Sequence, residues 1–128
     1  MDGWVQSGLR ALTHLTRPLA LRSAGRPGSP NSVVRHVGRR SGRAYETPVV
    51  AAQHGDSFYV ALPYGDRTDW SKNVLAAGSA IVLCDGVTHA VDRPEVLPMA
   101  EVTGYFGQKE QRLHRRFGVQ TALRLRLV

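Results

Sequence analysis

Four side chains suited to anion binding stand close together in one short stretch of the sequence. They are Arg39, Arg40, Ser41 and Arg43. Gly38 and Gly42 bracket the stretch, and glycine permits the positive φ angles of a tight turn. Such a turn points backbone N–H groups outward, and guanidinium groups bind phosphate or carboxylate through paired hydrogen bonds. The stretch therefore predicts an anion receptor, with a solvated basic turn as the alternative reading.

Strand-forming residues flank this turn on both sides. Val33, Val34 and Val37 precede it, and a run from Tyr45 to Ala52 follows it. The pattern predicts a β-hairpin over residues 33–49 whose second strand continues to Ala52. Pro48 cannot donate a ladder hydrogen bond, so the second strand must lie at a sheet edge or a bulge.

The rest of the chain predicts more strands with helices at the flanks and the end. Strands are expected over residues 57–62, 81–84, 87–91 continuing through 95–97, and 123–127. Asp69 is expected to N-cap a helix over residues 70–77 that Gly78 ends, and one further helix is expected from Pro98 to Gly118. About six antiparallel strands with flanking helices favour a mainly β fold, a small β-barrel, over a parallel sheet.

The N-terminal part differs from the rest. Residues 4–21 place apolar side chains at helical spacing with basic ones between them, and residues 22–32 are rich in Gly, Pro and Ser. We expect an amphipathic helix and linker over residues 1–30 and a compact domain over residues 31–128. The helix either docks on the domain or makes a peripheral contact with an anionic membrane through residues 4–21. No apolar run of spanning length or signal peptide is evident, so a cytoplasmic location is expected.

The amino-acid composition narrows the classes of molecule that the protein could bind. Seventeen Lys and Arg against ten Asp and Glu give a net charge of +7, almost all of it from arginine, which predicts attraction to anions. Aromatic residues make up 7% of the chain and form no stacking strand, which argues against nucleic acid. The single cysteine, Cys84, excludes an internal disulfide and is expected to be a small buried side chain. The five histidines lack ligand spacing, so no metal is expected.

Two motifs at this spacing resemble the deazaflavin-dependent nitroreductase family. They are G-R-R-S-G-R-x-x-x-T-P, beginning at Gly38, and W-x-x-N-V-x-A-A-G, beginning at Trp70, with L-P-Y-G at residues 62–65 between them. The resemblance covers residues 31–97. It implies a split β-barrel that binds coenzyme F-420, a deazaflavin with a phosphate and oligoglutamate tail, and uses the reduced form as a hydride donor.

The resemblance also implies roles for individual residues. Arg39, Arg40, Ser41 and Arg43 would bind the tail, and Thr47, Pro48 and Val49 would line the deazaflavin. Leu62, Pro63, Tyr64 and Gly65 would offer backbone groups to the polar edge of the ring. Trp70, Lys72 and Asn73 would lie at the cofactor, with core packing the alternative for Trp70 and a solvent or capping role the alternative for Asn73.

The implied reaction is hydride transfer to an electron-poor acceptor such as a quinone, an enone or a nitro compound. Tyr105 and Tyr64 are the candidate proton donors. The best-known nitroreductase members carry several tyrosines in the C-terminal third, where this chain has only Tyr105, so the substrate and the donor stay open.

Three other functions also remain open. One is an FMN-dependent split-barrel reductase, and another is a non-catalytic protein that binds a cofactor or lipid. The third is a membrane-surface or nucleic-acid binder that relies on the net positive charge. Barrel edges and apolar strands make a homodimer an expected assembly.

Overall fold

The computed structural model describes residues 25–28 and 31–128. The helix predicted over residues 4–21, with its membrane contact, lies outside the described residues. Within the described part of the chain, no helix is long and apolar enough to cross a membrane.

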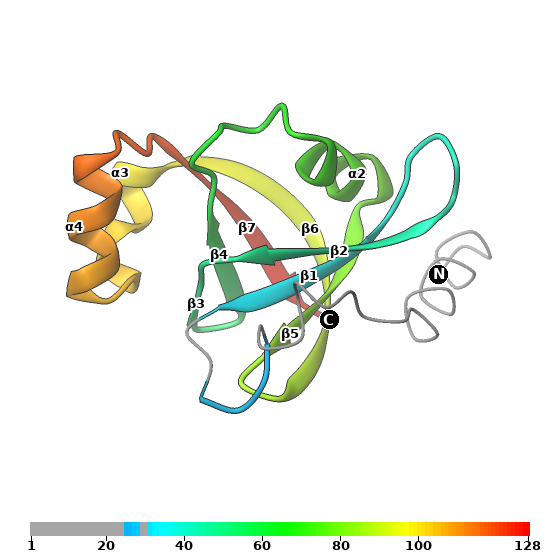
Figure 1. Cartoon of the computed structure of the whole chain (residues 1–128), viewed down its shortest axis with the longest axis horizontal. Coiled ribbons are helices and arrows are strands. Elements are labelled where there is room, and N and C mark those ends of the chain that lie inside the picture. The colour runs from blue at the N-terminus through cyan, green and yellow to red at the C-terminus, as the bar shows by residue number, and fades with distance from the viewer. Residues whose placement is uncertain (1–24, 29–30) are drawn as a thin grey trace.

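Seven antiparallel strands form one curled sheet (Figure 1). They are β1 (Ser32–Val37), β2 (Ala44–Val49), β3 (Ala51–His54), β4 (Ser57–Ala61), β5 (Ser79–Cys84), β6 (Val87–Pro98) and β7 (Thr121–Leu127). Their spatial order is β2-β1-β5-β6-β7-β4-β3. The two end strands, β2 and β3, follow each other in the chain with only Val50 between them, so the sheet curls back on itself. The mainly β, split-barrel fold predicted from the sequence is confirmed.

The strand count was one too low, because the stretch from Tyr45 to Ala52 forms two strands. β2 pairs with β1, whereas β3 pairs with β4, so the chain changes partner at Val50. Pro48 lies in β2, which pairs on one side only, as its missing N–H requires.

The core lies inside the curl of the sheet. Its fully buried side chains come from strands that are distant in the sequence, and they include Val34, Phe58, Val82, Leu123 and Leu125. In β7 the alternation predicted from the sequence puts Leu123 and Leu125 inside. Cys84 is only half-buried against this core, whereas full burial was expected.

The helices depart from the predictions at their ends. α2 (Asp69–Ala77) begins after Thr68, whose extended backbone (φ −67°, ψ 154°) makes it the N-cap in place of Asp69. The long helix predicted from Pro98 to Gly118 is instead α3 (Met99–Val102), a 3-10 turn η2 (Thr103–Tyr105) and α4 (Gln108–Arg116). The break has a local cause, because Phe106 and Gly107 both adopt extended backbone angles. Figure 1 shows α2 beside the β1–β2 turn and α3 and α4 together at the far end of β6 and β7.

Gly78→Ala is expected to lower the free energy of unfolding by about 1–2 kcal/mol. Gly78 ends α2 in the left-handed region (φ 73°) and its N–H donates to the Val74 carbonyl, and a side chain at such an angle is strained. Urea denaturation measures the change. Gly104→Ala is the matched control, since a methyl group there meets nothing and the backbone is not left-handed. Equal stability of the two variants would contradict the assignment.

Candidate active site

A polar cavity of about 640 Å³ lies between the β1–β2 turn and α2. Arginine, hydroxyl and amide groups line much of it. From the predicted site it takes in Arg39, Arg40, Ser41, Thr47, Trp70 and Asn73, and it adds His36, Tyr45, Glu46 and Asp69. The basic turn and the start of α2, which are 30 residues apart in the sequence, therefore form one cavity.

A second, largely apolar cavity of about 840 Å³ adjoins the first. Its predicted members are Thr47, Pro48, Val49, Leu62, Pro63, Tyr64, Gly65 and Trp70. One face of α4 completes it with Glu110, Leu113 and His114, together with Phe117. Thr47 and Trp70 line both cavities, so the two cavities adjoin at these residues and are together called the groove below.

Backbone hydrogen bonds close the basic turn. The Gly38 N–H donates to the Arg43 carbonyl (2.7 Å), and the Gly42 N–H donates to the Gly38 carbonyl (2.9 Å). The Ser41 hydroxyl oxygen accepts from the Arg43 N–H (3.2 Å). Gly42 has φ 73°, the positive angle that the sequence predicts for a glycine here. Arg40 is exposed at this turn, so its guanidinium is accessible to a ligand in the polar cavity.

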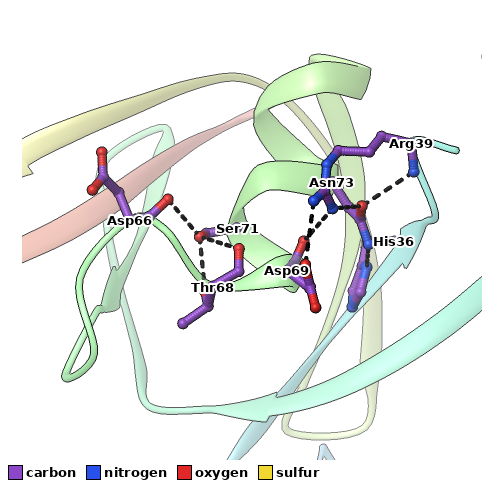
Figure 2. A network of polar contacts seen from close by, with 7 residues as sticks. All are labelled: His36, Arg39, Asp66, Thr68, Asp69, Ser71 and Asn73. Carbon is purple, nitrogen blue, oxygen red and sulfur yellow. Dashed lines mark hydrogen bonds and ion pairs between the residues drawn. The ribbon is translucent and has the colours of Figure 1, made fainter.

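Arg39 connects the turn to α2, as Figure 2 shows. Its Nη1 donates to Asn73 Oδ1 (2.8 Å), and its backbone N–H donates to the same oxygen (3.1 Å). Its Nη2 lies 3.2 Å from Asp69 Oδ1 in an ion pair. Arg39 therefore holds the turn against the helix, and only part of its hydrogen-bonding capacity faces a ligand.

His36 continues this network into the sheet. Asn73 Nδ2 lies 3.2 Å from His36 Nδ1, and His36 Nε2 lies 2.9 Å from Thr47 Oγ1. Only 4% of His36 is exposed, and burial lowers its pKa to about 4. The ring is therefore neutral near pH 7. Tyr45 stacks on it with ring centroids 5.8 Å apart.

The start of α2 is held by a second cluster in Figure 2. The fully buried Ser71 hydroxyl lies 2.9 Å from the Asp66 carbonyl and 3.0 Å from the Thr68 carbonyl. Its oxygen also lies 2.8 Å from Thr68 Oγ1. These contacts position the first turn of α2, which carries Trp70 into both cavities.

Three of the predicted site residues lie outside the two cavity linings. Arg43 and Lys72 are exposed and line neither cavity. Lys72 points away because Trp70 and Asn73, three residues apart, occupy the face of α2 that lines the polar cavity. The Tyr105 ring stacks on the His54 ring, with centroids 3.9 Å apart, and its centroid lies 4.7 Å from that of Tyr59. Tyr105 therefore lies against the β3–β4 hairpin.

The L-P-Y-G segment offers fewer backbone groups than its residues suggest. The Leu62 N–H donates to the Thr121 carbonyl (3.0 Å), and the Gly65 N–H donates to the Leu62 carbonyl (3.0 Å). A ligand in the apolar cavity therefore meets the remaining backbone groups of this segment and the exposed ring of Tyr64.

Several lining residues were not singled out from the sequence. His36 belongs to a strand and meets Asn73 only through the fold, so no local pattern marks it. On α4 the signal was present, since Glu110, Leu113, His114 and Phe117 recur at helical spacing on one face. Burial lowers the pKa of His114, and the Glu110 carboxylate partly opposes that effect.

Comparison with known families identifies the chain. The family model for F-420H(2)-dependent quinone reductase matches residues 10–117. The chain belongs to this F-420-dependent reductase family. It is therefore an oxidoreductase whose cofactor is coenzyme F-420, which confirms the family and cofactor predicted from the two motifs. No curated protein sequence matches the chain.

Solved structures share the fold of this F-420-dependent reductase at low sequence identity. One is described as an F-420-H2 dependent reductase (TM-score 0.57, 11% identity, covering 75% of this chain and 93% of that one). An FAD-binding protein from Mesorhizobium loti has a TM-score of 0.54 at 13% identity, covering 88% of this chain and 91% of that one. A third, described as a domain-swapped dimer, has a TM-score of 0.56 at 11% identity, covering 75% and 79%.

The residues of this F-420-dependent reductase suit its cofactor. The groove has a polar end with an exposed arginine and an apolar end of about 840 Å³, and these match an acidic tail and a flat ring system. Cavities of a few hundred to about 1,000 Å³ are typical of cofactor sites.

Proposed function

We propose that this reductase transfers a hydride from reduced F-420 to a flat, electron-poor small molecule such as a quinone, an enone or a nitro compound. The observation that carries the proposal is the groove itself, in which a basic polar cavity and an apolar cavity share Thr47 and Trp70. The bound reduced cofactor supplies the hydride. The protein supplies binding, orientation and a dry surface.

The polar cavity would bind the acidic tail. Arg40 is exposed there and is the arginine most accessible to phosphate or carboxylate, while Arg39 combines a ligand contact with its bonds to α2. Ser41 lies at the same turn. Arg43 and Lys72 add positive charge at longer range, since neither lines the cavity.

The apolar cavity would hold the ring and the acceptor. Pro48, Val49 and Leu62 form one wall, and Leu113 and Phe117 face it from the α4 side. Apolar walls exclude water from the reacting atoms, which suits hydride transfer. Tyr64 lines this cavity with 86% of its surface exposed and is the better placed of the two tyrosines to give a proton to the reduced acceptor.

Anaerobic mixing of the protein and reduced F-420 with a panel of quinones, enones and nitro compounds tests the proposal. We expect the visible absorbance of oxidised F-420 to return with at least one class, with FMN ineffective in place of F-420. Tight binding of F-420 with no oxidation across the panel would contradict catalysis and favour a cofactor-carrying protein.

Assembly as a homodimer and a cytoplasmic location stay predictions.

Phe117→Ala is expected to raise the KM for an apolar acceptor about 5- to 30-fold and to leave F-420 affinity unchanged. The ring is 70% exposed in the free protein, so a bound acceptor gains contact by covering it. Covering roughly 50–80 Å² of apolar surface contributes about 1–2 kcal/mol. Val87→Ala, at an exposed valine outside both cavities, is the control for steady-state kinetics. An unchanged KM in the Phe117 variant would place the acceptor elsewhere.

A further inference from the structure

We propose that Arg39, Asn73 and His36 form a relay of hydrogen bonds that turns the hydroxyl proton of Thr47 toward the bound ligand. Thr47 then recognises a hydrogen-bond acceptor at the point where the two cavities meet. The inference rests on the proposed function, because the ligand in question is coenzyme F-420. It assigns His36 and Asn73 a positioning role that acts through Thr47.

The first step fixes the orientation of the Asn73 amide. Two donors of Arg39, its backbone N–H and its Nη1, face the same Asn73 atom at 3.1 and 2.8 Å. That atom must be the oxygen, since an amide nitrogen does not accept hydrogen bonds. The amide NH2 is therefore the end that faces His36. Asn73 is 5% exposed, so this orientation is protected from solvent.

The second step fixes the tautomer of His36. The Asn73 NH2 donates to His36 Nδ1 at 3.2 Å, so Nδ1 carries no proton. The ring is neutral because burial lowers its pKa to about 4, and its single proton is therefore on Nε2. Nε2–H then donates to Thr47 Oγ1 at 2.9 Å.

The third step concerns the proton of Thr47. A hydroxyl has one proton to donate, and the Nε2–H of His36 prevents that proton from pointing at the ring. Thr47 lines both the polar and the apolar cavity, so its proton is directed to what they contain. The partner that this proton recognises is a carbonyl oxygen or an unprotonated ring nitrogen of the cofactor.

The substitution Asn73→Asp reverses the direction of the hydrogen bonds between residue 73, His36 and Thr47, while the shape of the side chain at position 73 hardly changes. One carboxylate oxygen still accepts from Arg39, but the other replaces the donor that faced Nδ1 and draws the ring proton to that nitrogen. In the neutral ring Nε2 then becomes an acceptor, and Thr47 must donate to it. We expect Asn73→Asp and Thr47→Val to lose F-420 affinity by the same factor of about 10, the size of one hydrogen bond.

The same variant makes F-420 binding depend on the protonation of His36, which is neutral in the wild type above about pH 6 because its pKa is lowered to about 4. The new carboxylate raises the pKa of His36, so lowering the pH from about 9 to about 6 protonates both ring nitrogens and frees the Thr47 proton again. F-420 affinity of Asn73→Asp should therefore recover at the lower pH. Other ionisable groups line the cavity near His36, and they are Arg39, Arg40, Tyr45, Glu46 and Asp69. They are present in both proteins, so comparison with the wild type cancels their contribution.

Fluorescence titration with F-420 and nitrogen-15 NMR of the histidine rings test the relay together. Thr47→Ser should bind F-420 within about twofold of the wild type, and Thr88→Val, at an exposed threonine, should not change binding. The ring spectrum of the protein without cofactor should show the His36 proton on Nε2 in the wild type and on Nδ1 in Asn73→Asp.

The outcomes separate the relay from the proposed function. Three results would each overturn the relay. The first is wild-type affinity for F-420 in both Thr47→Val and Asn73→Asp, and the second is a loss of affinity in Thr47→Val alone at all pH values. The third is a wild-type His36 ring that is protonated on Nδ1. Failure of the wild type to bind F-420 would overturn the proposed function, and the ring spectrum would still report the tautomer.

Discussion

Arg39→Ala combined with Arg40→Ala is expected to weaken F-420 binding by about 3–6 kcal/mol, because each charged hydrogen bond contributes about 1.5–3 kcal/mol. This corresponds to a factor of at least about 100 in affinity. The two arginines differ in how they act. Arg40 is exposed and is proposed to contact the tail directly, whereas Arg39 also holds Asn73 and Asp69, so its loss loosens the turn as well. Fluorescence titration with F-420 measures the loss.

Two control measurements test whether the loss of affinity comes from contacts with the cofactor tail. Arg115→Ala removes one exposed positive charge from α4 outside both cavities and should change affinity by less than about 1 kcal/mol. The same deazaflavin without its phosphate and glutamates should bind the double variant nearly as well as it binds the wild type. If the double variant loses affinity equally for both ligands, the arginines do not bind the tail.

Acidification from about pH 7 to about pH 4 is expected to remove about 3 kcal/mol of stability through His36 alone. The folded protein lowers the pKa of this histidine from 6.5 to about 4, because the buried ring is poorly solvated. Between these values the unfolded chain binds a proton that the folded chain excludes. The contribution of the neutral ring is therefore fully present above pH 6.5 and is lost as the pH falls toward 4.

Urea denaturation of the wild type and His36→Gln at several pH values measures this contribution. The variant is less stable at pH 7 but should show a shallower fall in stability on acidification. His54→Gln, at an exposed histidine, should keep the wild-type slope. A slope unchanged by His36→Gln would mean that the ring is not held neutral. His114, whose pKa burial also lowers, accounts for part of the slope that remains.

Local patterns were enough to predict most of the elements of the barrel. The valines around Gly38 and Gly42 predicted the β1–β2 hairpin, and the glycine at position 78 predicted the end of α2. The two errors have different causes. The change of strand partner at Val50 depends on how the sheet closes, whereas the helix break follows the extended backbone of Phe106 and Gly107 within a stretch that has a helical apolar pattern.

The candidate site shows the same division between local and tertiary information. Arg40 was expected at the site from the basic turn, and Thr47, Trp70 and Asn73 from the resemblance to the family, and all four line the polar cavity. His36 could not, since its partner Asn73 is 37 residues away and the contact exists only after β1 packs against α2. The α4 face was overlooked because one continuous helix was expected from Pro98 to Gly118, and the large exposed fractions of Leu113 and Phe117 could not be foreseen from the sequence.

Parallel fluorescence titration of the wild type with F-420, tail-free deazaflavin and FMN tests the central claim most directly. If the basic turn binds an acidic tail while the apolar cavity holds the ring, F-420 binds most tightly, and removal of the tail costs at least about 100-fold in affinity. Equal affinity for F-420 and its tail-free form, or tighter binding of FMN, would contradict the claim.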